Sequence, residues 1–78
     1  MAIYDATLPI EEGMITFPGD PLFRMEKFLD TSSGDAFNLS ILHIGTHTGT
    51  HVDPPAHYIK GGASVDELPL DALIGPGL

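Results

Sequence analysis

The alternation of apolar and polar positions along the chain predicts short β-strands. Residues 36–44 carry the clearest pattern, because every second residue from Phe37 to His43 falls on one mostly apolar face, as the two-residue period of a strand requires. Residues 2–8 alternate more weakly and are also interpreted as a strand. Residues 22–29 fit either a strand or two helical turns. We favour the strand, because a proline precedes this segment and a polar loop follows it.

Proline and glycine mark the breaks between these segments. The chain has seven Pro and nine Gly in 78 residues, which argues against long helices. Pro18-Gly19-Asp20-Pro21 is typical of a tight turn, and the loop 45–57, with its paired prolines, cannot be a regular helix. Residues 66–74 fit one short helix, which the Gly-Pro-Gly of 75–77 ends. The pattern therefore predicts an α+β fold of mostly short strands with one short helix.

The length and the absence of cysteine limit how such a chain is stabilised. Its 78 residues allow one domain at most, so we expect residues 1–78 to belong to a single domain. A globule of this size buries only about 60% of the surface that its unfolded chain exposes. Without Cys the chain has no disulfide, no thiolate zinc site and no cysteine nucleophile. A metal ion or a partner chain remains as a source of additional stability.

The charge balance excludes two classes of partner. The formal net charge is −8, and Arg24, Lys27 and Lys60 are too few to form a groove for nucleic acid or to attract an anionic membrane. The apolar runs are too short to cross a bilayer, and the N-terminus lacks the basic and apolar regions of a secretory signal. We therefore expect a cytoplasmic protein that binds neither nucleic acid nor membrane.

The candidate chemistry lies in one short segment with the spacing His47-x3-His51-x-Asp53-x3-His57. Imidazole and carboxylate groups together suit Zn²⁺, and also Mn²⁺ or Fe²⁺. His51 and Asp53 are two residues apart, so an extended backbone points both side chains the same way, and His47 joins them if the chain folds back at Gly49. Three protein ligands leave a coordination position open, as in catalytic sites. The alternative is a surface loop in which the histidines coincide by chance.

The remaining histidines have other expected roles. Pro54 and Pro55 stiffen the chain before His57, which suits a general acid or base beside a metal, although a fourth ligand or a bystander remain alternatives. His43 continues the apolar face of its strand, so we expect a buried or half-buried structural residue bound to a carbonyl. Composition alone places Phe17 in the core. The hydroxyls of the loop are expected to satisfy backbone groups; they belong to Thr46, Thr48 and Thr50.

Three segments resemble one known family. His-Thr-Gly-Thr-His-Val-Asp-Pro-Pro-Ala-His at 47–57 closely resembles the signature of the cyclase family of metal-dependent hydrolases, which includes bacterial kynurenine formamidases and isatin hydrolases. Residues 4–10 and 17–21 resemble the N-terminal strand and the following Pro-Gly-Asp-Pro loop of that family, and residues 68–76 resemble the helix and turn after its metal loop. The resemblance covers nearly the whole chain and implies part of a β/β/α cyclase-like (swivelling) domain.

The resemblance also implies roles for individual residues. His47, His51 and Asp53 match the first three metal ligands of the family, in which the aspartate can bridge two metals. His57 matches the proton donor and acceptor. Phe17 matches an aromatic residue that contacts the substrate, and this reading replaces the core position that composition suggests. The implied cofactor is Zn²⁺, or Mn²⁺ in its place, with one or two ions per site.

The implied activity is hydrolysis of an amide-type C–N bond in a small-molecule substrate. The kynurenine formamidases convert N-formylkynurenine to kynurenine and formate in tryptophan catabolism. Hydrolysis of a cyclic imide such as isatin, or of a lactone, is the alternative within the same family. A non-catalytic metal-binding or association module, or an inactive fragment, is the alternative from another class.

The chain departs from the family in one respect. The family has two more metal ligands, a His and a Glu, in its C-terminal half, and no residue here stands in a matching context. The sequence therefore predicts the N-terminal portion of such a domain. Such a chain would expose strand edges, so we expect it to form a homo-oligomer or to associate with the C-terminal half.

Overall fold

The computed structural model describes residues 1–77, and its main element is a two-stranded antiparallel sheet. Strand β1 (Arg24–Leu29) pairs with β2 (Leu39–His43), so that Arg24 faces His43 at the open end of the hairpin. The register shifts between Lys27 and Leu29, where a bulge gives β1 one extra residue. Both strands lie within the segments predicted from alternation, and these two predictions are confirmed.

Four single turns of 3₁₀-helix make up the remaining regular structure of the described residues. Their bounds are η1 (Thr31–Ser33), η2 (Pro55–His57), η3 (Val65–Glu67) and η4 (Leu70–Ala72). The two short strands and the short 3₁₀ turns agree with the predicted α+β class, although the one short helix expected within it is not present as a continuous element among residues 1–77. No helix among residues 1–77 is long and apolar enough to cross a membrane.

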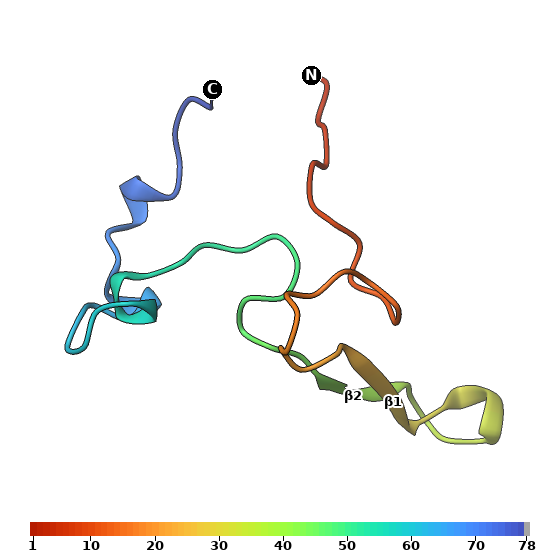
Figure 1. Ribbon diagram of the computed structural model, residues 1–78. Helices are drawn as coiled ribbons and strands as arrows, with labels where there is room; N and C mark the ends of the chain where they lie inside the picture. Colours follow the sequence, from red (N-terminus) through yellow and green to blue (C-terminus); the bar gives the residue numbers. More distant parts are fainter. Residues whose placement is uncertain (78) are drawn as a thin grey trace.

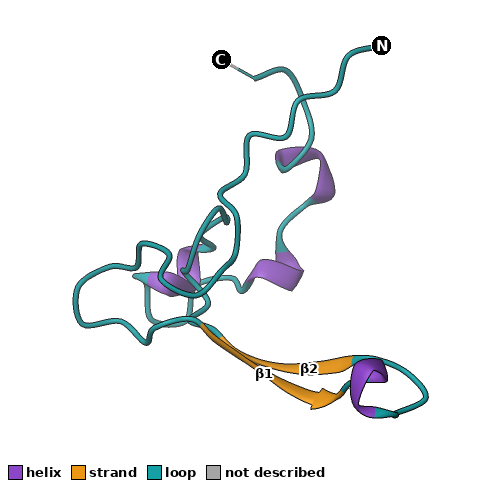
Figure 2. Ribbon diagram, turned by 90° about the vertical axis from the view of Figure 1, so that its right-hand side faces the viewer, coloured by secondary structure: helices purple, strands orange, loops and turns teal. Residues whose placement is uncertain are grey.

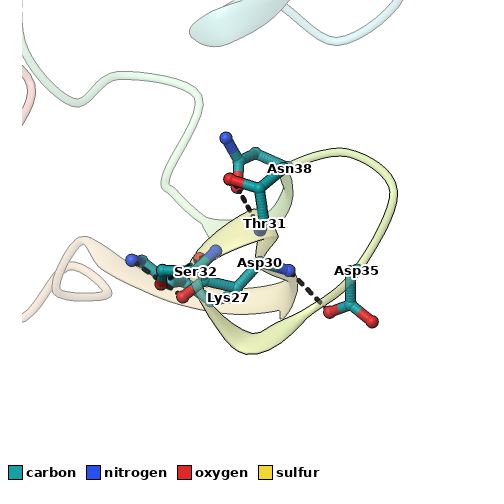
Figure 3. Close-up of polar contacts among 6 residues, drawn as sticks. All are labelled: Lys27, Asp30, Thr31, Ser32, Asp35 and Asn38. Carbon is teal, nitrogen blue, oxygen red and sulfur yellow. Dashed lines mark hydrogen bonds and ion pairs between the residues drawn. The ribbon is translucent and has the colours of Figure 1, made fainter.

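Side chains hold the tip of the hairpin, where η1 connects the two strands (Figure 3). Asp30 Oδ1 accepts hydrogen bonds from Ser32 N at 2.9 Å and from Ser32 Oγ at 2.6 Å. Asp35 Oδ2 in turn accepts from Asp30 N at 2.7 Å. Asn38 Oδ1 accepts from Thr31 N at 2.8 Å, which joins the start of η1 to the start of β2. Short polar side chains thereby satisfy the backbone donors of the tip.

The molecule has an open shape. Figures 1 and 2 show the hairpin extending to one side, with both termini at the opposite end and loops between them. The radius of gyration is 16.8 Å, whereas a compact domain of this length has about 12 Å. Phe23, which is 7% exposed, is the buried apolar side chain among the described residues, and Leu39 and Ile41 of β2 remain partly exposed. The faces of the sheet are therefore largely uncovered.

Two predicted elements differ in the structure. Residues 2–8 form no strand, because no neighbouring strand supplies backbone partners for them. Residues 66–74 form no continuous helix, and η3 and η4 lie on either side of an extended Leu68 and Pro69. Pro69 lacks an N–H donor and keeps Leu68 out of the helical region, at ψ 138°. The proline inside the apolar pattern therefore divides the expected helix.

Candidate metal centre

The loop after β2 folds back on itself and brings three side chains together. Thr48 N donates to Gly45 O at 3.1 Å, which closes the first turn of the loop. Gly49 follows with φ +71°, a left-handed conformation that glycine adopts without strain. The chain then reverses so that His51 returns to the side of His47. The fold-back at Gly49 that the spacing requires is present.

The ligand atoms of His47, His51 and Asp53 form a small triangle. Asp53 Oδ1 lies 2.8 Å from His47 Nδ1 and 3.0 Å from His51 Nε2, and the two nitrogens are 3.2 Å apart. A tetrahedral Zn²⁺ with bonds of about 2.0–2.1 Å holds its ligand atoms about 3.3 Å apart. The triangle is therefore close to the size that such an ion requires, and the three residues fit the metal that the sequence predicts.

Hydrogen bonding within the triangle also favours a bound cation. His51 Nδ1 lies 2.7 Å from the carbonyl oxygen of Gly49, which can only accept, so Nδ1 carries the proton of the neutral ring. His51 Nε2 then presents a lone pair to Asp53 Oδ1, which is also an acceptor. Two acceptors at 3.0 Å repel each other unless a cation lies between them. A metal ion or a proton between the two atoms removes this repulsion.

Asp53 has the charge that a metal ligand needs. The hydrogen bond from His47 lowers the pKa of its carboxyl group below the ordinary value of 3.8. The carboxylate is therefore ionised at neutral pH. Half of its side chain remains accessible, at 47% exposure, so an ion can approach from solvent.

His57 lies beside the triangle. Its ring centroid is 3.6 Å from that of His47, with an angle of 33° between the rings, and 4.2 Å from the ring of Tyr58. Pro54 O accepts from His57 N at 3.0 Å, which holds the backbone of His57 in η2. The converging ligand atoms belong to the other three residues. His57 therefore adjoins the candidate metal position from one side.

These residues line one pocket of about 530 Å³. Phe17 faces this pocket from a turn in which Asp20 N donates to Phe17 O at 2.9 Å and Gly19 has φ +92°. Phe17 is 75% exposed, so the core position suggested by composition is wrong. Two further lining residues, Asp20 and Tyr58, were not among the predicted site residues. Their signals were local, since Asp20 shares the turn of Phe17 and Tyr58 follows His57. The lining comprises Phe17, Asp20, His47, His51, Asp53, His57 and Tyr58.

His43 lies apart from this pocket and contradicts the structural role expected for it. Its side chain is 46% exposed, and Nε2 lies 3.8 Å from Glu26 Oε2 on the same face of the hairpin. About half of the side chain is therefore covered, as one of the expected alternatives had it, but the expected carbonyl partner is wrong, because His43 faces the Glu26 carboxylate instead. The apolar alternation correctly placed His43 on the strand but could not show that the face stays open.

Comparison with known proteins places the chain in a family. A family model described as "Putative cyclase" matches residues 4–78. Similar curated proteins include the kynurenine formamidases of Paracidovorax citrulli (strain AAC00-1), at 36% identity over 95% of this chain, and Polaromonas naphthalenivorans (strain CJ2), at 33% over 97%. The kynurenine formamidase of Salinibacter ruber is 38% identical over 97% of this chain. The chain spans 34–36% of the length of these relatives. No solved structure gives a significant match.

Proposed function

The chain belongs to the cyclase family, and from this membership we propose that it serves the metal-dependent hydrolysis of an amide-type C–N bond. The proposed substrate is an aryl formamide such as N-formylkynurenine. Three relatives named kynurenine formamidase support this substrate class. The observation that carries the proposal is the convergence of His47, His51 and Asp53, with His57 and an aromatic side chain in the same pocket.

His47, His51 and Asp53 would hold the metal, with Zn²⁺ as the first candidate and Mn²⁺ as the second. A divalent ion held by these residues would supply Lewis acidity, which lowers the pKa of a water molecule towards neutrality and polarises a substrate carbonyl. With two neutral imidazoles and one carboxylate as ligands, a bound dication would keep one net positive charge. That charge would favour the oxyanion that develops when an amide carbonyl is attacked.

His57 would move the proton. An imidazole nitrogen accepts a proton as water attacks the carbonyl carbon and returns it to the nitrogen of the leaving amine as the C–N bond breaks. Its ring lies beside that of His47, whereas the converging ligand atoms belong to the other three residues, which supports a proton-transfer role. Phe17 would stack on the aromatic ring of the substrate and turn the amide towards the histidines.

A His57→Ala variant tests the proton transfer. We expect turnover of an aryl formamide to fall by about 10²- to 10⁴-fold, the usual contribution of a general acid or base, while the metal content is unchanged. His43→Ala is the matched control, because this histidine lies outside the pocket. A His57→Ala variant that retained most of the wild-type rate would show that the acid–base assignment is wrong. A cyclic imide assayed in parallel would identify the alternative substrate class.

A further inference from the structure

We propose that residues 8–14 form a strap that positions the metal loop, with Thr50 as its hydrogen-bonded attachment. This inference rests on the metal site proposed above. Leu8 N donates to Thr50 Oγ1 at 2.9 Å, although the two residues are 42 positions apart in the sequence. Residues 8–14 have no strand or helix that would fix them otherwise. Such a contact ties an irregular segment to the loop between two candidate metal ligands.

The same segment touches the loop a second time, at Gly49. A Cβ atom built on Gly49 would lie 3.3 Å from Met14 Cε and 4.0 Å from Ile10 Cγ1. The side chains of the strap therefore approach the backbone of Gly49 on the side where other residues carry a side chain. Gly49 also has φ +71°. Close approach and left-handed backbone each favour glycine at this position.

Gly49 connects the strap to a metal ligand. Its carbonyl oxygen accepts from His51 Nδ1 at 2.7 Å, and this hydrogen bond fixes both the ring orientation and the tautomer of His51. His51 Nε2 is thereby left to face Asp53. A strap that holds the backbone at Gly49 and Thr50 consequently holds the carbonyl that orients the ligand. Thr50 and Gly49 are positioning residues, since the Thr50 hydroxyl accepts from Leu8 N and Gly49 acts through its backbone carbonyl.

The other end of the strap is tied to the hairpin. Met25 N, on β1, donates to Glu12 Oε1 at 3.2 Å. Within the strap, Met14 N donates to Glu11 O at 3.1 Å, and Gly13 has φ +83°, so the segment makes a defined turn there. The strap thus spans from the regular sheet to the irregular metal loop. It thereby holds in place a loop that has no regular secondary structure between residues 44 and 54.

The test compares zinc binding by Thr50→Val and Thr50→Ser with that of the wild-type chain. Valine keeps the shape of threonine but removes the acceptor, whereas serine keeps the hydroxyl. We expect Thr50→Val to weaken zinc affinity by about tenfold or more in isothermal titration, as loss of an outer-shell partner does, and Thr50→Ser to restore it. The visible spectrum of bound Co²⁺ should shift in Thr50→Val alone. Thr46→Val is the matched control, because Thr46 makes no hydrogen bond to residues 8–14.

The outcomes separate this inference from the metal site beneath it. If the wild-type chain binds zinc and Thr50→Val binds it with the same affinity and the same Co²⁺ spectrum, the strap alone is overturned. Equal losses in Thr50→Val and Thr50→Ser, or in Thr50→Val and Thr46→Val, would overturn it as well, because the hydroxyl would not be responsible. A wild-type chain that binds no zinc would overturn the proposed metal site and the strap together.

Discussion

One carboxylate oxygen lies at the centre of the candidate site. Asp53 Oδ1 lies within 3.0 Å of a nitrogen from each of the two histidines, so the three side chains are held by a shared atom. The second ring nitrogen of His51 is committed to the Gly49 carbonyl. The ligand atoms of the three side chains are therefore directed towards one point, which reduces the ordering cost of metal binding.

Phe17 provides a prediction at the scale of a single residue. Phe17→Ala should raise the KM for an aryl formamide roughly three- to tenfold, because a stacked aromatic pair contributes about 0.5–1.5 kcal/mol. Metal content should not change. Steady-state kinetics would measure the effect, with Phe37→Ala as control, since Phe37 is also exposed but does not line the pocket. Equal KM values for Phe17→Ala and wild type would remove Phe17 from substrate binding.

The sequence identified the candidate metal ligands but not the detailed geometry around them. Spacing and ligand chemistry singled out His47, His51 and Asp53, and the structure brings their ligand atoms together. The shared oxygen could not be predicted, because it depends on the left-handed turn at Gly49. Asp20 and Tyr58 also line the pocket, and each could have been identified from its position beside a predicted site residue, Phe17 or His57. The roles of His57 and Phe17 remain predictions.

At the scale of elements, the hairpin is the main regular secondary structure of the described residues. Alternation predicted β2, and the flanking proline and polar loop predicted β1, while the tip is closed by the side chains of Asp30, Asp35 and Asn38. The expected strand over residues 2–8 failed for a physical reason, since a strand requires a partner. The expected helix over 66–74 failed because Pro69 interrupts it. Alternation predicts which segments favour extended structure, whereas pairing is decided by the rest of the molecule.

The hairpin tip should depend on pH. Hydrogen bonds from Ser32, aided by Lys27, lower the pKa of Asp30 from 3.8 to about 2. Because the folded-state pKa is depressed, the stabilising contribution is complete above pH 3.8 and is lost as the pH falls towards 2. The protection of the Ser32 amide against hydrogen exchange, taken relative to its intrinsic exchange rate at each pH, should therefore fall over this range in the wild type. Asp30→Asn should abolish that dependence, whereas Asp71→Asn should keep it. A wild-type amide that is equally protected at both ends of the range would contradict the assignment.

At the scale of the whole molecule, the chain buries little of its apolar surface. Phe23 is buried, while the apolar side chains of both strands remain partly or largely exposed. Composition predicted a single small domain with a limited core, but it could not show how open the chain is. Exposed apolar area of this kind favours association with another surface. The open faces of the sheet are therefore available for contact with another protein surface.

We therefore expect the chain to self-associate. Sedimentation or light scattering should give a mass above the 8.3 kDa of one chain at micromolar concentration. Ile41→Lys should shift the distribution towards the monomer, because it places a charge on the open face of β2. Lys60→Ala, on a loop outside the sheet, is the control. A wild-type chain that is monomeric at all concentrations would contradict this expectation.

The metal content of the chain tests the central claim most directly. After exhaustive dialysis, elemental mass spectrometry of the wild-type chain should find about one or more Zn²⁺ or Mn²⁺ ions per chain. His51→Ala should lose the ion, because it removes one of three converging ligands, and His43→Ala should retain it. A wild-type chain without metal, or a His51→Ala variant with the same metal content as wild type, would contradict the proposed centre.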